Sequence, residues 1–136
     1  MVCAEMNFAS GGTSKEVETD LWINSNPTAS FANQNITLSD NISNYKRIKF
    51  VILTKANTYR SVEVSSEEFL NYNDTNGGFF GITERENTKD RWLRTFNSAT
   101  STSKQMGIGG AYKMNGSGND NSYVRPYKII GIKWYN

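Results

Sequence analysis

The sequence predicts an all-β domain, namely an antiparallel β-sandwich of jelly-roll-like character with little helix. Stretches that are apolar, or that alternate apolar and polar residues, recur at intervals of about 8–12 residues between turn-forming residues. No long stretch shows the 3.6-residue apolar period of an amphipathic helix. The chain has 136 residues, and this length favours one folded domain.

The N-terminal segment differs from the rest of the chain. Residues 1–19 contain few apolar side chains and include the flexible pair Gly11 and Gly12. We expect these residues to form a flexible leader or a link to a preceding domain. The first residues also lack the basic stretch and the apolar stretch of a secretory signal, so no signal peptide is expected. The sandwich is therefore expected to occupy residues 20–136.

The middle of the chain supplies most of the predicted strands. Residues 48–53 are almost all apolar and rich in β-branched side chains, which predicts a central strand buried on both faces. Residues 59–64 alternate, with Val62 and Val64 facing inward. Ser65 has the pattern of a helix N-cap, so one helical turn is expected at residues 65–70. Further short strands are expected at residues 36–38, 79–83 and 91–96.

The C-terminal part gives the clearest strand patterns. Between residues 106 and 114, the larger apolar side chains alternate with Gly107, Gly109 and Ala111, which would occupy the opposite face. Small residues on one face of a strand indicate that another backbone or a ring approaches closely there. Residues 115–121 form a polar loop. Residues 127–134 predict the last strand, with Ile130, Ile132 and Trp134 on one face.

The composition excludes several classes of function. The chain contains no histidine, and Cys3 is its only cysteine, so the usual general base, zinc clusters and intrachain disulfides are not expected. Fifteen basic residues against 13 acidic ones leave a formal net charge of +2, which does not indicate a nucleic-acid partner. No apolar run is long enough to span a membrane. We expect no cofactor and no metal site.

Two glycine-containing motifs favour a structural interpretation. Gly107, Gly109 and Gly110 resemble a phosphate-binding loop, but the Lys and Ser/Thr ending is missing and no helix pattern follows. Glycine in a packed strand explains them better. Residues 71–77 combine oxygen ligands with a glycine, as a calcium loop does, but the closing glutamate is absent. A plain turn is the preferred interpretation there.

Three carboxylates near one another raise the question of glycoside hydrolysis. Glu84, Glu86 and Asp90 lie within seven residues, and a glycosidase needs two carboxylates on either side of a cleft. Basic residues alternate with them, which is typical of a solvated loop with paired charges. We therefore expect the protein not to be an enzyme, and a glycan-cleaving activity is the less favoured reading.

Part of the sequence resembles a known group of proteins. The order of motifs is similar to that in the C-terminal domains of tail, baseplate and minor structural proteins of phages and prophages of Gram-positive bacteria. The motifs are DLWINSNPT at residues 20–28, SFANQNITLS at 30–39, ISNY at 42–45 and PYKIIGIKW at 126–134. The resemblance covers residue 21 to the end, and it specifies no catalytic residue.

The resemblance implies a β-sandwich on a virion or a prophage-derived particle. Its partners would be other tail or baseplate proteins and a host cell-surface polysaccharide, and it would form a homo-oligomer, expected to be a trimer. The small-residue face at residues 107–111 is consistent with self-association. The alternative function is a non-catalytic carbohydrate-binding module of a secreted or surface protein.

Any ligand is expected to bind to loops at one end of the sandwich, because loops carry recognition while strands hold them in place. The loops concerned are residues 71–78, the region of Trp92 and residues 115–121. For each aromatic side chain, a place in the core is the competing interpretation. The residues that we expect to stack on a sugar or to hydrogen-bond with it are Trp92, Tyr72, Asn73, Asp74, Asn119 and Asp120.

Overall fold

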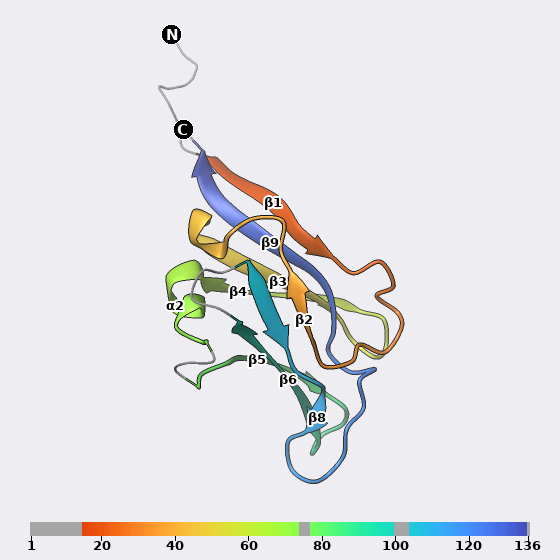
Figure 1. Cartoon of the computed structure of the whole chain (residues 1–136). Helices are drawn as coiled ribbons and strands as arrows, with labels where there is room; N and C mark the ends of the chain where they lie inside the picture. The colour runs from red at the N-terminus through yellow and green to blue at the C-terminus, as the bar shows by residue number, and fades with distance from the viewer. Residues whose placement is uncertain (1–14, 74–76, 100–103, 136) are drawn as a thin grey trace.

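A computed structural model of the protein describes residues 15–73, 77–99 and 104–135, and these residues form two β-sheets (Figure 1). One sheet has four strands in the order β1-β9-β3-β4, and the other has five, in the order β2-β7-β6-β5 with β8 paired to β6. The elements are β1 (Lys15–Ile23), β2 (Gln34–Thr37), the 3-10 turn η1 (Ile42–Asn44), β3 (Arg47–Leu53), β4 (Tyr59–Ser65), α2 (Ser66–Leu70), β5 (Phe80–Arg85), β6 (Arg91–Ser98), β7 (Gln105–Ile108), β8 (Tyr112–Lys113) and β9 (Arg125–Tyr135).

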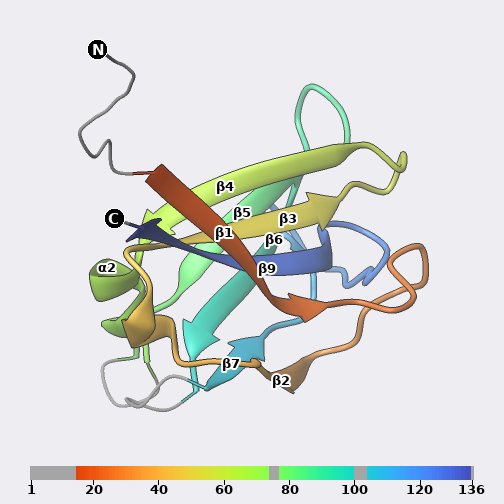
Figure 2. The same ribbon diagram turned by 90° about the horizontal axis from the view of Figure 1, so that it is seen from above.

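The predicted all-β sandwich is confirmed. Every pair of neighbouring strands in the two sheets is antiparallel, and Figure 2 shows the sheets in two layers. The chain passes between the layers from β1 to β2, from β2 to β3, from β4 to β5 and from β8 to β9, as in a jelly roll. The β3–β4 hairpin and the β5–β6–β7 meander instead stay within one sheet. The fold therefore resembles a jelly roll only in the connections that pass from one sheet to the other.

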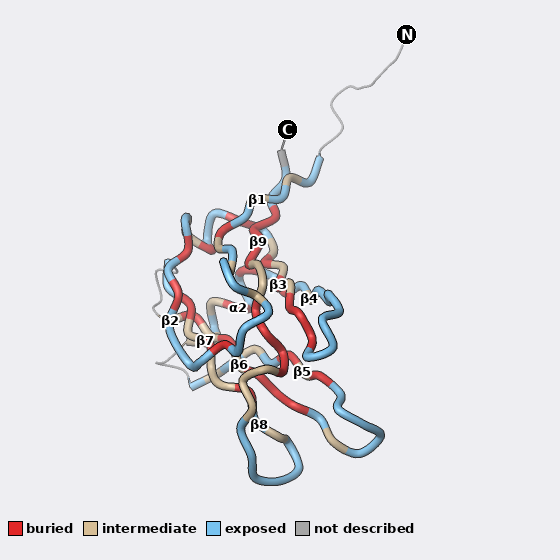
Figure 3. The backbone as a smooth tube through the Cα atoms, turned by 90° about the vertical axis from the view of Figure 1, so that its right-hand side faces the viewer, coloured by how far each residue is buried: buried red, intermediate tan, exposed pale blue. Residues whose placement is uncertain are grey.

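The core lies between the inner faces of the two sheets. Phe50 of β3 is fully buried, and its ring centroid lies 5.0–5.4 Å from those of Phe69, Phe80 and Phe96. Figure 3 shows the buried segments running along the strands, while the loops around β8 and between β5 and β6 are exposed. The expected helical turn is α2, capped by Ser65, whose hydroxyl accepts a hydrogen bond from the Glu68 N–H. No helix of the described residues is long and apolar enough to cross a membrane.

The outer face of the four-stranded sheet is charged. Arg47 pairs with Glu16 and Glu63 at 2.6 and 2.8 Å, and Lys49 pairs with Glu18 at 3.3 Å. The methylene groups of long charged side chains can cover apolar surface beneath them. This arrangement corrects the expectation that residues 48–53 are buried on both faces. Strand β3 is central, but only its inner side chains are buried, and Lys49 and Val51 remain partly exposed.

The expected domain boundary at residue 20 is too late. Strand β1 begins at Lys15 and pairs with β9 from the Lys15–Tyr135 rung onward. The stretch before Asp20 alternates, with Val17 and Thr19 partly buried while Glu16 and Glu18 face solvent. A strand at the sheet edge needs only a few apolar side chains, because one of its faces is solvated. Residues 1–14 of the expected leader lie outside the described residues.

Residues 106–114 do not form one continuous strand. Met106 and Ile108 are buried in β7, whereas Tyr112 and Met114 are 40% and 51% exposed. Between β7 and β8 the backbone leaves the ladder. There the Gly109 carbonyl accepts a hydrogen bond from Arg94, and the Ala111 N–H donates to Oδ1 of Asn121. The small-residue face expected at residues 107–111 is therefore interrupted, and Ala111 is buried.

Candidate functional site

The outer face of the five-stranded sheet carries uncharged polar side chains and glycines across β2, β7 and the second half of β6, while Arg85 and Arg91 lie at the far end of β5 and β6. One rung across this face joins Asn35 of β2, Gly107 of β7 and Asn97 of β6. On the next rung, Thr95 pairs with Gly81 of β5, and its carbonyl accepts a hydrogen bond from the Gly109 N–H. This face thus contrasts with the ion-paired outer face of the other sheet.

Two adjoining hollows on this face share lining residues, and we call the two together the amide groove. The hollows have volumes of about 330 and 440 Å³, and both are lined by Asn33, Thr95 and Gly109. No residue that lines either hollow carries a charge. The other lining residues are Asn35, Gly77, Gly78, Phe79, Asn97, Gly107, Ile108, Gly110, Tyr112, Asn119 and Asn121.

Glycines keep the floor of the amide groove low. A Cβ atom on Gly107 would lie 2.4 Å from Oδ1 of Asn97 and 3.2 Å from Oδ1 of Asn35. A Cβ atom on Gly109 would lie 2.5 Å from the Thr95 hydroxyl oxygen. Both separations at Asn97 and Thr95 are shorter than real Cβ contacts. The glycines therefore allow polar side chains of neighbouring strands to lie across the floor.

Two exposed aromatic rings mark opposite ends of the amide groove. Phe79 is 52% exposed and lies beside Gly81, whereas Tyr112 is 40% exposed and follows the strand break after β7. Tyr112 pairs with Leu93, and Phe80 pairs with Phe96. Strands β5 and β8 pair with β6 on its opposite sides, so the two aromatic residues come from opposite sides of that strand. A ligand that touched both rings would have to be extended.

Amide groups between these rings are available to a ligand. The side chains of Asn33 and Asn35 are exposed and make no hydrogen bond with other residues in the described part of the chain. Each amide offers two N–H donors and one carbonyl acceptor. The side-chain carbonyl of Asn121 is already used, because its Oδ1 accepts a hydrogen bond from the Ala111 N–H. The amide groove therefore offers both donors and acceptors without a net charge.

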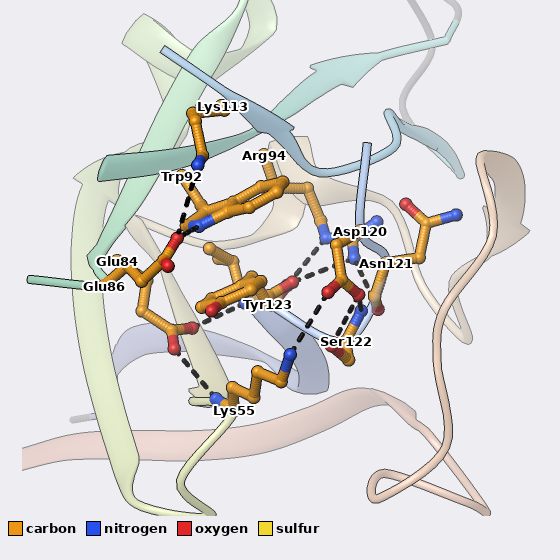
Figure 4. Close-up of polar contacts among 11 residues, drawn as sticks. Lys55, Glu84, Glu86, Trp92, Arg94, Lys113, Asp120, Asn121, Ser122 and Tyr123 are labelled. Atoms are coloured by element: carbon orange, nitrogen blue, oxygen red, sulfur yellow. Dashed lines mark hydrogen bonds and ion pairs between the residues drawn. The ribbon is translucent and has the colours of Figure 1, made fainter. Parts of the chain in front are cut away.

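Trp92 lies inside the molecule, which corrects the expectation that it offers a stacking face. It is 6% exposed, and its ring stacks on that of Tyr123 with centroids 4.4 Å apart and planes at 6° (Figure 4). Lys113 Nζ lies 5.5 Å from the Trp92 ring centroid, and Lys55 Nζ lies 4.6 Å from that of Tyr123. The indole N–H donates to Glu86 at 2.7 Å. Both faces of the Trp92 ring are thus occupied.

Two predicted residues of the loop at residues 115–121 lie in different places, one at the amide groove and the other beside Lys55. Asn119 is exposed and lines the amide groove, as its predicted role requires. Asp120 instead accepts hydrogen bonds from the hydroxyl and the N–H of Ser122 and forms an ion pair with Lys55 at 3.2 Å. The Ser122 hydrogen bonds, together with Lys55, lower the pKa of the Asp120 carboxyl. Asp120 therefore shapes the loop and does not line the groove.

The loop at residues 71–78 contributes its glycines rather than the predicted side chains. Tyr72 is partly buried, packs edge-on against Phe69, and donates its hydroxyl to Glu68 at 2.9 Å. The Asn73 amide donates to the Leu70 carbonyl. Neither side chain lines the amide groove, whereas Gly77 and Gly78 do. Asp74 lies outside the described residues.

The three neighbouring carboxylates hold the structure together. Glu84 is 6% exposed and accepts hydrogen bonds from the N–H groups of Lys55 and Val124 at 2.9 and 2.7 Å. Glu86 accepts from Trp92, as described above. Asp90 accepts from the side-chain amides of Asn87 and Asn115, and the Asn115 bond is the largest cause of its lowered pKa. This corrects the expectation of a solvated loop for Glu84. No three acidic or cysteine side chains of the described residues group as a metal site.

Arg94 is fully buried beneath the amide groove. Its guanidinium donates five hydrogen bonds to backbone carbonyls, all within 3.2 Å, and no carboxylate in the described part of the chain pairs with it. An arginine has five N–H donors, so all of them are used. Burial lowers the pKa of Arg94 to about 10, which leaves the group charged at neutral pH. The five acceptors are the carbonyls of Phe31, Gly109, Asn121, Tyr123 and Val124.

Val124 links this arginine to a buried acid. Its N–H donates to Glu84, and its carbonyl accepts from Nε of Arg94 at 2.6 Å. The φ angle of Val124 is 47°, in the left-handed region that β-branched residues rarely adopt. Such a conformation costs about 1–3 kcal/mol and persists only where the surroundings impose it. Here Glu84 binds the N–H of Val124 and Arg94 binds its carbonyl, so both backbone polar groups of the residue are fixed.

The amide groove was missed at the sequence level because its parts are far apart in the chain. Asn33 and Asn35, and likewise Thr95 and Asn97, occur at alternate positions beside the buried Ile36 and Phe96. This alternation places them on the outer face, and it could have been recognised in the sequence. Their convergence with Gly107 depends on strand register, which the sequence alone did not supply. No family model matches the chain. No curated protein matches it either.

Proposed function

We propose that this domain attaches a phage tail or baseplate to the host surface by binding an uncharged polysaccharide in the amide groove. One observation carries the proposal: five asparagines and five glycines line the amide groove together with two exposed aromatic rings, and no lining residue carries a charge. The proposed setting, a virion or prophage-derived particle, rests on the resemblance of the sequence motifs to tail proteins of Gram-positive bacteria.

The chemistry of the groove favours a neutral glycan over other ligands. Sugar hydroxyls both donate and accept hydrogen bonds, as side-chain amides do. Aromatic rings such as Phe79 and Tyr112 pack against the apolar face of a sugar. A nucleic acid or an acidic polymer would require basic side chains, and none lines the groove. The ligand class is therefore uncharged and rich in hydroxyl groups.

Attachment by such a groove would depend on several copies. Each hydrogen bond to a sugar contributes only about 1 kcal/mol, so a single groove binds weakly. A homo-oligomer, which we propose to be a trimer held by other tail or baseplate proteins, would add the avidity required. Light scattering of the purified domain is expected to show the trimer at high concentration. A strict monomer across the concentration range would contradict self-association of this chain.

A non-catalytic carbohydrate-binding module is the second candidate, and the same groove favours it. The two candidates differ in where the protein is found. Mass spectrometry of purified phage or prophage particles is expected to detect the chain. Its absence from particles, together with its presence in culture medium or on the cell surface, would favour the binding module.

Binding is tested with neutral cell-wall polysaccharide from a Gram-positive host, freed of teichoic acid and immobilised on a biosensor. Phe79→Ala and Tyr112→Ala remove the rings at the two groove ends. Each is expected to weaken binding by roughly fivefold to tenfold, corresponding to about 1–1.4 kcal/mol. Both side chains are exposed, so the melting temperature should change little.

Matched controls lie outside the groove. Tyr59→Ala and Trp134→Ala remove exposed rings of 60% and 47% exposure that line neither hollow of the amide groove. Their binding should equal that of the wild type. If the two groove variants bind as well as the two controls, the amide groove is not the binding site. If an oligomeric wild-type protein binds none of a panel of neutral wall polysaccharides, the glycan proposal itself fails.

A further inference from the structure

Beneath the amide groove, a buried arginine contacts the segments that line the groove. Arg94 donates from Nη1 to the carbonyls of Phe31 and Gly109 at 2.9 and 2.7 Å. It donates from Nη2 to the carbonyls of Asn121 and Tyr123 at 3.2 and 3.0 Å, and from Nε to that of Val124. These carbonyls belong to three segments that lie before β2, after β7 and before β9.

Each of the three segments supplies lining residues of the amide groove. Phe31 precedes Asn33 by two residues, and Gly109 lines both hollows. Asn121 lines one hollow together with Asn119. The segments are far apart in sequence and none of them belongs to a strand, so ladder hydrogen bonds fix them incompletely. Hydrogen bonds from the Phe31 N–H to the Asn121 carbonyl and from the Asp120 N–H to the Ala111 carbonyl link these segments in pairs. The Arg94 guanidinium adds a group that contacts all three segments at once.

We propose that Arg94 is the positioning residue of the amide groove: it sets the relative placement of the Asn33, Gly109 and Asn121 segments without touching the ligand. The ligand part of this inference rests on the proposed glycan function, whereas the placement part does not.

The chemistry of the contact explains why arginine occupies this position. The five N–H groups of a guanidinium point outward in one plane with fixed angles, so five carbonyls bound to it are fixed relative to one another. Lysine has three donors on a flexible stem and cannot hold five acceptors in one plane. Glu84 completes the arrangement by holding the N–H of Val124. Replacement of arginine by lysine therefore keeps the charge and removes the fixed geometry.

A second buried arginine provides a matched control. Arg125 is 4% exposed and also donates to backbone carbonyls, those of Thr28 and Thr54, and to the Asn57 side chain. None of these acceptors lines the amide groove. Arg125→Lys should thus disturb a comparable buried network at another place. A role in general stability predicts similar effects of the two substitutions, whereas a positioning role predicts different ones.

The experiment compares the wild type, Arg94→Lys and Arg125→Lys of the full chain in two measurements. Amide hydrogen exchange without ligand is expected to accelerate in Arg94→Lys at residues 31–33, 109–111 and 119–124, while amides shared by β1, β9 and β3 keep their protection. Binding to the immobilised neutral wall polysaccharide is expected to weaken about tenfold or more in Arg94→Lys. Arg125→Lys should leave both readouts at the groove unchanged.

The outcomes separate this inference from the proposed function. Unchanged exchange at the three segments in Arg94→Lys, or equal acceleration there in Arg125→Lys, would overturn the positioning role. If the wild type binds no wall polysaccharide, the glycan function fails, and the exchange measurement still decides the placement. If neither Arg94→Lys nor Arg94→Gln folds while Arg125→Lys does, Arg94 supports the whole domain and the inference is wrong.

Discussion

The ring of Trp92 lies flat against the ring of Tyr123, with centroids 4.4 Å apart and an interplanar angle of 6°. The two rings come from β6 and from the segment before β9, and lysines cover the outer face of each ring. The stack thus joins the middle of one sheet to the entry of the last strand in the other. This position makes Trp92 a structural residue and moves the candidate ligand site to the amide groove.

Trp92→Ala is expected to lower the free energy of unfolding by about 3–5 kcal/mol, because a buried aromatic ring is lost and a cavity remains. Urea denaturation followed by circular dichroism measures the change. Trp134→Ala serves as the control, since that ring is 47% exposed and its loss should matter little. Equal stability of Trp92→Ala and the wild type would show that the stack does not support the fold.

Gly107→Ala is expected to damage ligand binding more than stability. The added Cβ would lie 2.4 Å from Oδ1 of Asn97, so that amide must move away from the groove floor. Because the neighbour is a side chain that can rotate, the unfolding free energy should change by about 1 kcal/mol or less. Gly116→Ala is the control, as nothing lies within 4 Å of a Cβ there. Wild-type affinity of a folded Gly107→Ala protein would speak against a ligand on this floor.

Ile52→Asp is expected to abolish folding. Ile52 of β3 is 1% exposed, and a carboxylate at this position would lose its hydration without gaining a partner. Val51→Asp places the same charge one residue earlier on the partly exposed outer face and should be tolerated much better. Thermal melting followed by circular dichroism distinguishes the two. A soluble, cooperatively melting Ile52→Asp protein would mean that β3 is not a central strand.

Acid is expected to destabilise the loop that contains Asp120. Hydrogen bonds from Ser122 and the ion pair with Lys55 hold the folded pKa of Asp120 below its usual value of 3.8. A lowered pKa gives stability that is present above pH 3.8 and is lost as the pH falls through the folded value. Asp120→Asn should therefore be less stable than the wild type at pH 7, and the difference should shrink on acidification. A difference that is constant down to strongly acid pH would exclude this linkage.

No hydrolysis of wall polysaccharide is expected. The chain has no histidine, Glu84 is occupied by two backbone N–H groups, and Glu86 by the indole of Trp92. Reducing-sugar release from neutral wall polysaccharide is the assay. Turnover that disappears in Glu84→Gln or Glu86→Gln, while both variants remain folded, would establish catalysis instead.

The fold could be predicted where local patterns decide it. The alternation around Val62 and Val64 and the Ser65 cap each gave the observed element, because side-chain period and capping are local properties. The burial of Arg94 could not be predicted, since arginine is rarely fully buried and its five acceptors come from three distant segments. The strand break at Gly109 could not be predicted either, because it depends on the same distant contacts. The candidate site was therefore only partly predicted: Asn119 lines it, whereas Trp92 belongs to the interior.

The pairing of β1 with β9 determines how the domain would carry a load. Lys15 lies opposite Tyr135, so β1 begins where β9 ends (Figure 1). Interstrand hydrogen bonds of an antiparallel pair run perpendicular to the strands. A pull on both of these strand ends would therefore open the bonds one after another, like a zipper. If the domain is held at Lys15 alone and pulled through a ligand, β1 is drawn along β9 and its bonds resist together. The same domain would then be mechanically strong as an end-mounted anchor and weak as a link within a stretched chain.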